Sequence, residues 1–228
     1  NFTSATDSFN TAVGYNAGTS VTTGVQNTLI GGLAGDALVD AHFNTAVGYQ
    51  ALSTDTESNY NTAIGYRALL VANNTSSTNG YNVAVGADAG QAVTTALENT
   101  LIGALAGDAI TTGNSNTAVG KSALSAATTG TLNVAIGKDA LRDNTTAAAN
   151  TAVGTVSMRL NTTGASNTAV GYGSLDTNTT GGSNVAIGRD SLTANTTASN
   201  NTAVGYNSLV ANTTGTSNVA LGAYALDA

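Results

Sequence analysis

The side chains that could carry out acid–base or nucleophilic chemistry are few and scattered. The chain has 228 residues, one histidine and no cysteine, so it offers no thiol nucleophile and no disulfide framework. A serine–histidine–aspartate arrangement would have to use His42, which precedes a turn-forming asparagine. The carboxylates fall at different places in the repeat described below, so no acid–base pair is visible. We therefore expect no enzymatic activity, no catalytic residue and no cofactor.

Metal and phosphate sites have little support in the sequence. Asp36 and Asp108 each follow a glycine, which indicates either a weak cation site or an ordinary turn. Gly31-Gly32 is interpreted as a turn, because no phosphate-binding lysine follows it. The net charge of −7, with only six Lys and Arg, disfavours nucleic acid and anionic membranes. No apolar run approaches a transmembrane length, so we expect no membrane insertion by this segment.

A repeated frame organises the whole chain. The pattern Asn-x-x-x-Gly-x-x-(Ala/Ser) occurs thirteen times, with successive asparagines 17 residues apart except for one interval of 21. The frame asparagines are Asn10, Asn27, Asn44, Asn61, Asn82, Asn99, Asn116, Asn133, Asn150, Asn167, Asn184, Asn201 and Asn218. A fixed short period is the signature of a solenoid. We number each repeat from its asparagine, which is position 1.

Each repeat predicts one coil of an all-β, parallel β-roll. Positions 1 to 4 alternate with β-branched residues at 2 and 4, which favours a short strand with those two side chains facing the interior. The glycine at position 5 should bend the chain, and positions 7 to 10 should form a second strand with Leu at position 9 inside. We expect one elongated domain over residues 1–228 with about thirteen coils, and a protruding four-residue insertion within 73–81. Representative frame residues are Asn44, Gly48, Asn116, Gly120, Asn167, Gly171, Asn201 and Gly205.

The residues at position 3 predict an interface between copies of the chain. It is alanine in eleven of the thirteen repeats, and the strand alternation places it opposite positions 2 and 4. A row of small outward residues would let another backbone approach closely, so we expect an interface with a copy of the same chain. Examples of this predicted interface are Ala46, Ala118, Ala169 and Ala203. The alternative is a lone solenoid with a smooth alanine face.

Three further columns bear on function. The position 1 asparagines can stack their amides from coil to coil. The position 6 tyrosines, which either fill a corner or stack on sugars, are Tyr15, Tyr49, Tyr66, Tyr172 and Tyr206. Five Asn-Thr-Thr segments are both good turns and glycosylation sequons. Their asparagines are Asn144, Asn161, Asn178, Asn195 and Asn212.

Two segments carry a family resemblance. Ser183-Asn184-Val185-Ala186-Ile187-Gly188 and Ser217-Asn218-Val219-Ala220-Leu221-Gly222 resemble the NSVAIG motif of trimeric autotransporter adhesin heads of the YadA-like type. Similar repeats occur in phage tail-fibre-like and other surface fibre proteins. The resemblance covers the chain from about Asn10 to Ala228. It implies a left-handed roll, a homotrimer, and an extracellular place on a cell surface or virion fibre, where such heads bind matrices.

The leading hypothesis is therefore a structural, adhesive fibre segment with a matrix or carbohydrate ligand. Neither end shows an atypical capping repeat, so we expect either a longer repeat chain or axial stacking into a filament. The alternative function is an ice- or crystal-surface-binding solenoid that uses its threonine rows. An enzyme built on a solenoid is a third reading, and it lacks a catalytic cluster.

Overall fold

The computed structural model describes residues 8–73 and 78–227 and shows a β-solenoid with a 17-residue repeat. No helix occurs among these residues, so the predicted all-β class is confirmed. The chain divides into two compact units, residues 1–115 and 116–228. The strands of the first unit are β1 (Thr11–Val13), β2 (Thr28–Ile30), β3 (Thr45–Val47), β4 (Thr62–Ile64), β5 (Val83–Val85) and β6 (Thr100–Ile102). Those of the second unit are β7 (Thr117–Val119), β8 (Val134–Ile136), β9 (Thr151–Val153), β10 (Thr168–Val170), β11 (Val185–Ile187), β12 (Thr202–Val204) and β13 (Val219–Leu221).

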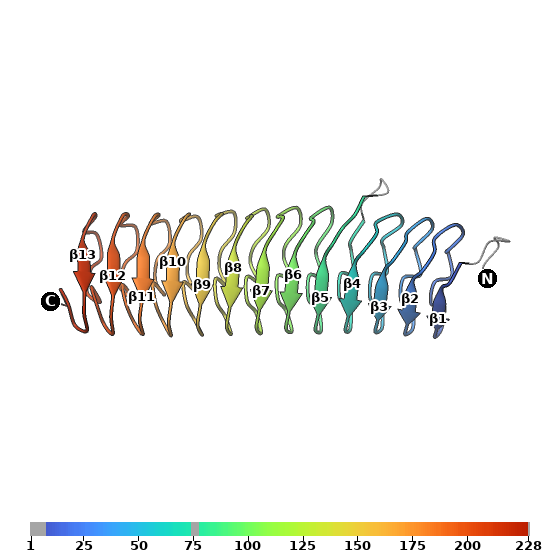
Figure 1. Ribbon diagram of the computed structural model, residues 1–228, viewed down its shortest axis with the longest axis horizontal. Helices are drawn as coiled ribbons and strands as arrows, with labels where there is room; N and C mark the ends of the chain where they lie inside the picture. Colours follow the sequence, from blue (N-terminus) through green and yellow to red (C-terminus); the bar gives the residue numbers. More distant parts are fainter. Residues whose placement is uncertain (1–7, 74–77, 228) are drawn as a thin grey trace. The chain divides into compact units, whose positions relative to one another are not determined.

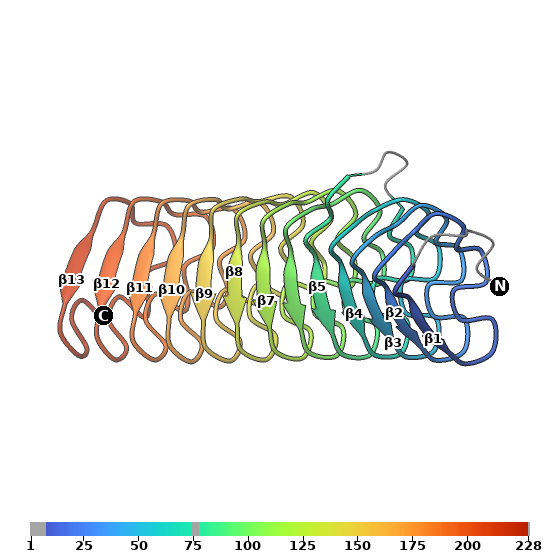
Figure 2. The same ribbon diagram turned by 45° about the vertical axis from the view of Figure 1, so that its right-hand side comes forward.

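Within each unit the strands form a parallel sheet in chain order, as Figure 1 shows. Pairing joins equivalent positions of successive coils. Ala46 of β3 lies opposite Ala63 of β4, and Ala169 of β10 lies opposite Ala186 of β11. The turned view in Figure 2 shows each strand continuing into turns that complete its coil. The register therefore stacks identical positions into straight rows.

The frame glycine bends the chain directly after every strand, as predicted. All thirteen frame glycines have φ between +119° and +140°, a region that an L side chain avoids. Close stacking also requires glycine here. A Cβ at Gly48 would lie 2.4 Å from the carbonyl oxygen of Gly65, and one at Gly171 would lie 2.6 Å from that of Gly188. Both the conformation and the space therefore select glycine at position 5.

The prediction of a second strand at positions 7 to 10 is wrong. Positions 7 and 9 have positive φ throughout, for example +55° at Gln50 and +53° at Leu52, and such residues cannot continue a strand. The segment is instead a stack of turns. Its backbone still bonds from coil to coil, because the Leu52 amide donates to the Ala68 carbonyl at 3.0 Å. Each coil thus has a single three-residue strand.

The predicted inward and outward faces of the strand are reversed. The position 3 residues are buried in every coil after the first, and Ala46, Ala118, Ala169 and Ala203 have no exposed surface. They therefore cannot line an outer interface. The position 4 side chains face outward instead, and Ile64, Ile136 and Ile187 are 38 to 40% exposed.

The narrowness of the coil explains this reversal. Position 9 supplies a large buried side chain from the opposite wall, such as Leu124 or Met158, which confirms that part of the prediction. Positions 8 and 12 fill the remaining interior, as Ala123 and Ala127 do. A small residue at position 3 leaves room for them, whereas an inward Val or Ile at two strand positions would overfill the space.

The predicted asparagine ladder is present in both units. Within each unit, a frame asparagine accepts, through Oδ1, a hydrogen bond from the backbone N–H of the next frame asparagine. Asn44 accepts from Asn61 at 2.8 Å, and Asn167 accepts from Asn184 at 2.9 Å. The side-chain amide also closes its own coil, because Asn44 Nδ2 donates to the Ser58 carbonyl at 2.8 Å. These buried amides are thus satisfied by stacked neighbours.

The predicted insertion falls partly outside the described residues. Residues 74–77 are not described, so their predicted protrusion stays a prediction. On either side the solenoid register holds. Asn59 and Asn79 form a parallel bridge, and the Gly80 amide donates to the Asn59 carbonyl at 2.9 Å.

Candidate interaction surfaces

His42 has partners for both of its ring nitrogens. Nδ1 accepts a hydrogen bond from the Val25 backbone N–H at 3.0 Å, and Nε2 lies 3.5 Å from Asp40 Oδ1. Because Nδ1 is an acceptor here, the proton of the neutral ring lies on Nε2, toward the carboxylate. The arrangement leaves neither nitrogen available to take a proton from a nucleophile.

The candidate cation residues are not brought together with other ligands. Asp36 Oδ1 accepts from Ser53 Oγ at 2.7 Å, as a turn carboxylate does. Asp108 Oδ1 is buried without a hydrogen-bond partner, and burial raises the pKa of this carboxyl. Among residues 8–73 and 78–227, no three His, Cys, Asp or Glu side chains cluster as metal ligands would.

The charged side chains mostly form surface pairs. Two pairs join adjacent residues: Lys138 Nζ lies 3.7 Å from Asp139, and Arg189 Nε lies 3.0 Å from Asp190. Arg159 bonds to Asp176 in the neighbouring coil at 3.0 and 3.1 Å. Such exposed pairs contribute little to stability individually.

The sequon asparagines have structural roles, and their burial argues against glycosylation at these sites. Asn144, Asn161, Asn178 and Asn195 are buried, and Asn212 in the last full turn is partly buried. The Asn178 Nδ2 atom, which would carry a glycan, donates to Asn161 Oδ1 at 2.7 Å and to the Gly181 carbonyl at 2.9 Å. The five asparagines form a second ladder at position 12. A glycan on Nδ2 would break it.

Position 12 carries one buried carboxyl. In the third coil Asp55 replaces the apolar residues of its neighbours and is fully buried. It accepts from the Ser58 hydroxyl and from the Ser58 N–H at 3.1 Å. Desolvation raises the pKa of the Asp55 carboxyl, and the bonds from Ser58 oppose that rise.

The position 6 tyrosines lie on the surface in two separate groups. All five are 40 to 76% exposed, so they contribute little to the interior. In the first unit Tyr49 and Tyr66 stack with centroids 6.0 Å apart, while Gly32 separates them from Tyr15. In the second unit Arg189 lies over Tyr172 at 5.6 Å and over Tyr206 at 5.9 Å. The surface thus offers aromatic rings, and two of them, Tyr172 and Tyr206, flank one guanidinium.

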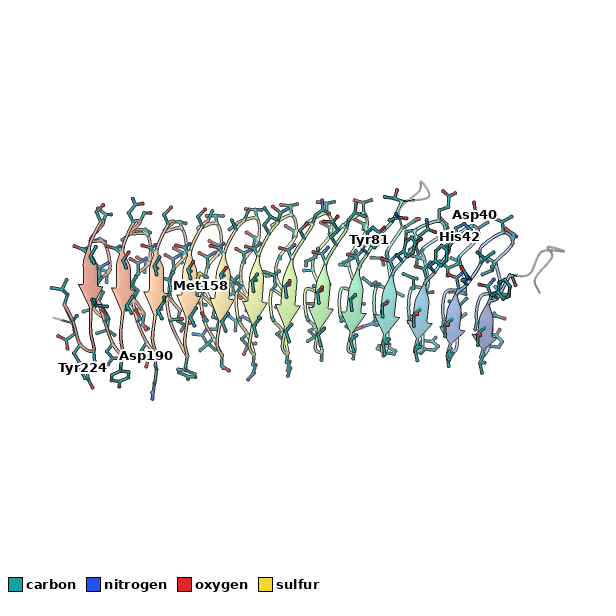
Figure 3. All side chains as sticks on the ribbon, in the orientation of Figure 1. Asp40, His42, Tyr81, Met158, Asp190 and Tyr224 are labelled. Atoms are coloured by element: carbon teal, nitrogen blue, oxygen red, sulfur yellow. The ribbon has the colours of Figure 1, made fainter. Side chains whose placement is uncertain are left out.

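A second aromatic column, which the sequence interpretation missed, lies at position 17. Phe43 and Tyr60 stack with centroids 4.7 Å apart, and Tyr60 and Tyr81 stack at 5.3 Å. We call these three residues the aromatic row. The available signal was that an aromatic residue directly precedes three successive frame asparagines. In Figure 3, Asp40, His42 and Tyr81 lie beside the turns that lead into the strands, whereas Asp190 and Tyr224 lie beyond the strand ends.

The outward face of the strands is uncharged and largely apolar. Position 2 is Thr or Val, and position 4 is Val, Ile or Leu, in every repeat. Stacking turns these residues into two continuous rows on the sheet of each unit. The position 4 row consists of Val13, Ile30, Val47, Ile64, Val85 and Ile102 in the first unit and Val119, Ile136, Val153, Val170, Ile187, Val204 and Leu221 in the second.

Comparison with known proteins adds no family or fold relative. The chain matches no protein-family model, no curated protein and no solved structure. In the described part of the chain, no helix has the length and apolar character needed to cross a bilayer.

Proposed function

We propose that this chain is a structural and adhesive segment of an extracellular fibre on a cell surface or virion, built as a homo-oligomer. The observation that carries the proposal is the uncharged outer face of the strands. Valines and isoleucines at position 4 are exposed by more than a third in several coils, such as Ile64, Ile102 and Val170. A continuous row of exposed apolar side chains is typical of an interaction surface.

The partner proposed for this face is another copy of the same chain. Its rows repeat at the strand spacing of about 4.8 Å, and a second copy presents rows with the same spacing. The absence of charge at positions 2 and 4 removes repulsion between identical surfaces. The resemblance to trimeric adhesin heads favours three copies. A fibre of identical coils also offers many equivalent weak contacts to a matrix or carbohydrate, which gives avidity.

The sparse polar chemistry is consistent with a role other than catalysis. His42 is held between a backbone N–H and Asp40. Asp36 accepts a hydrogen bond from Ser53, which occupies the same position in the next coil. We therefore propose no reaction and no cofactor for this chain.

Sedimentation of the purified chain tests the association. The parent should sediment as an oligomer, and a variant with Val170→Glu and Ile187→Glu should sediment as a monomer because like charges would face each other. The matched control, Thr163→Glu with Thr180→Glu, places the same charges on exposed turn residues of neighbouring coils. It should remain oligomeric. A monomeric parent, or equal dissociation by both variants, would contradict the proposed interface.

Binding to an ice or crystal surface is the second candidate. The position 14 threonines of the second unit form one regular exposed row: Thr129, Thr146, Thr163, Thr180, Thr197 and Thr214. The neighbouring position 13 hydroxyls point along the stack instead, as Thr162 Oγ1 does when it donates to the Thr179 carbonyl at 2.9 Å. Thermal hysteresis of the parent, lost in the Thr163→Glu and Thr180→Glu variant, would favour this candidate over the fibre.

A further inference from the structure

The aromatic row of the first unit is an exposed surface that the fold does not need. Phe43 and Tyr60 are each 42% exposed, and Tyr81 is 51% exposed. Apart from Phe9 and Leu132, position 17 elsewhere holds small or polar residues, such as Ser166, Ser183 and Ser217, in coils with the same backbone conformation. Since serine serves the coil equally well, the three consecutive rings call for another explanation.

Three carboxylates belong to the coils that carry this row or follow it. Asp40 and Glu57 occupy position 14 in neighbouring coils, and Glu98 occupies position 17 in the coil that follows Tyr81. The backbone bonds keep these rows in register, since the Tyr60 amide donates to the His42 carbonyl and the Glu98 amide to the Gly80 carbonyl. The described residues at positions 13 to 17 of the first unit include no Lys or Arg. The surface is therefore aromatic and anionic together.

The chain itself shows which cation such a surface accepts. Arg67 lies over the ring of Tyr66 with its guanidinium carbon 4.8 Å from the centroid. Arg189 lies between two tyrosines of the same row, while its Nε bonds to Asp190 at 3.0 Å. In both places a guanidinium combines a ring with a carboxylate, since Arg67 Nε also bonds to Asp88 at 2.8 Å. Guanidinium groups favour this combination because they are planar and weakly hydrated.

We propose that the aromatic row, with Asp40, Glu57 and Glu98, binds an extended arginine-rich segment of another protein along the stack. Alternate side chains of an extended peptide point the same way, so arginines at every second residue can face the row together. Arginines would lie over the outer faces of Phe43 and Tyr81, since the inner faces of these rings stack on Tyr60, and others would bond to the carboxylates. This site does not depend on the oligomer proposed above.

The basic residues of this chain are poor candidates for the partner. Most of those in the second unit already face their own carboxylates: Lys138, Arg142, Arg159 and Arg189 are paired with Asp139, Asp143, Asp176 and Asp190. Arg67 is paired with Asp88. The surface is therefore assigned to a different protein with unpaired arginines.

Fluorescence anisotropy with labelled peptides tests this inference on the full chain. An alternating Arg-Gly peptide of about ten residues should bind more tightly than the matching Lys-Gly peptide, and a Glu-Gly peptide should not bind. Tyr60→Ser should weaken binding of the Arg-Gly peptide by about three- to tenfold, because it breaks the stack that holds the rings of Phe43 and Tyr81 in place for cation–π contact. Asp40→Asn with Glu57→Gln should weaken it further and reduce its salt dependence. Thermal melting of each variant verifies that the fold is retained.

Tyr172→Ser in the second unit is the matched control, because it removes an exposed tyrosine from another row. It should leave the affinity unchanged. The inference is overturned if the Arg-Gly peptide fails to bind at low salt, or if Tyr60→Ser binds as the parent does. It is equally overturned if Tyr172→Ser weakens binding as much as Tyr60→Ser, or if Lys-Gly and Arg-Gly bind alike.

Discussion

Leu29 occupies the space in which a side chain at Gly35 would lie. A Cβ added to Gly35 would approach Leu29 Cδ2 to 2.7 Å and Leu38 Cδ1 to 2.8 Å. The same relationship recurs in a later coil of the first unit, where a Cβ at Gly107 would approach Leu101 and Ile110 at 2.7 and 2.8 Å. In these two coils glycine at position 9 thus accompanies larger residues at positions 3 and 12, which fill the interior volume that Leu occupies in other coils.

Gly35→Leu should therefore destabilise the chain by about 1–3 kcal/mol through overpacking. A variant that combines it with Leu29→Ala and Leu38→Ala should recover most of this loss. The combination reproduces a trio already present as Ala118, Leu124 and Ala127, with Leu124 at a φ of +55° that matches Gly35. Urea denaturation measures both effects. Equal stability of the single and the triple variant would contradict the volume argument.

Asp55→Asn should stabilise the chain at neutral pH by about 1–3 kcal/mol, since it removes a buried charge. Burial raises the folded pKa of Asp55 above its ordinary value of 3.8. Its favourable contribution is thus complete below that value and is lost as the pH rises through the folded pKa. The advantage of the variant should consequently shrink as the pH falls toward 4. Denaturation midpoints at several pH values provide the measurement.

The reverse change in the second unit is the control for Asp55. Asn161→Asp places a carboxyl in a buried site where the side chain donates to Asn144 and to the Gly164 carbonyl. It should destabilise the chain, and more at pH 7 than at pH 4. A pH-independent effect of either substitution would show that desolvation is not its cause.

Asn178→Ala should lower the free energy of unfolding by about 1–3 kcal/mol, because it interrupts the middle of the position 12 ladder. Asn178 donates to Asn161 and Gly181 and accepts from Asn195 at 2.9 Å. Asn144→Ala, at the start of the ladder, should cost less, since Asn144 bonds only to Ala147 and Asn161. Thermal unfolding compares the two. A larger loss at Asn144 would argue against the ladder as a stabilising unit.

Ala169→Arg and Val170→Arg should differ sharply although the residues are adjacent. Ala169 is fully buried, so arginine there should prevent folding, at a cost beyond about 4 kcal/mol. Val170 is 36% exposed, and arginine there should leave the fold intact with a stability change below about 1 kcal/mol. Circular dichroism melting distinguishes them. A folded Ala169→Arg chain would restore the original prediction of an outward alanine.

The sequence alone determined the 17-residue repeat and the bend that ends each strand. The 17-residue period gave the stacked parallel coils, and the glycine at position 5 gave the bend, because that position needs both a positive φ and a close approach to the next backbone. The asparagine ladder was also predictable, since identical amides at one position of a stack can bond to each other. Leu at position 9 was recognisable as interior from its size.

Only the tertiary structure decided which strand face is inside and where polar side chains lie. Alternation specifies two faces, but with alanine on one and valine or isoleucine on the other, either can be buried. The interior volume left by Leu124 and its equivalents made the alanine face the inner one. The same stacking buried Asn161 and Asn178, which look like exposed turn residues in the sequence. It also brought Phe43, Tyr60 and Tyr81 into one row, because residues separated by a whole coil become neighbours only when the coils stack.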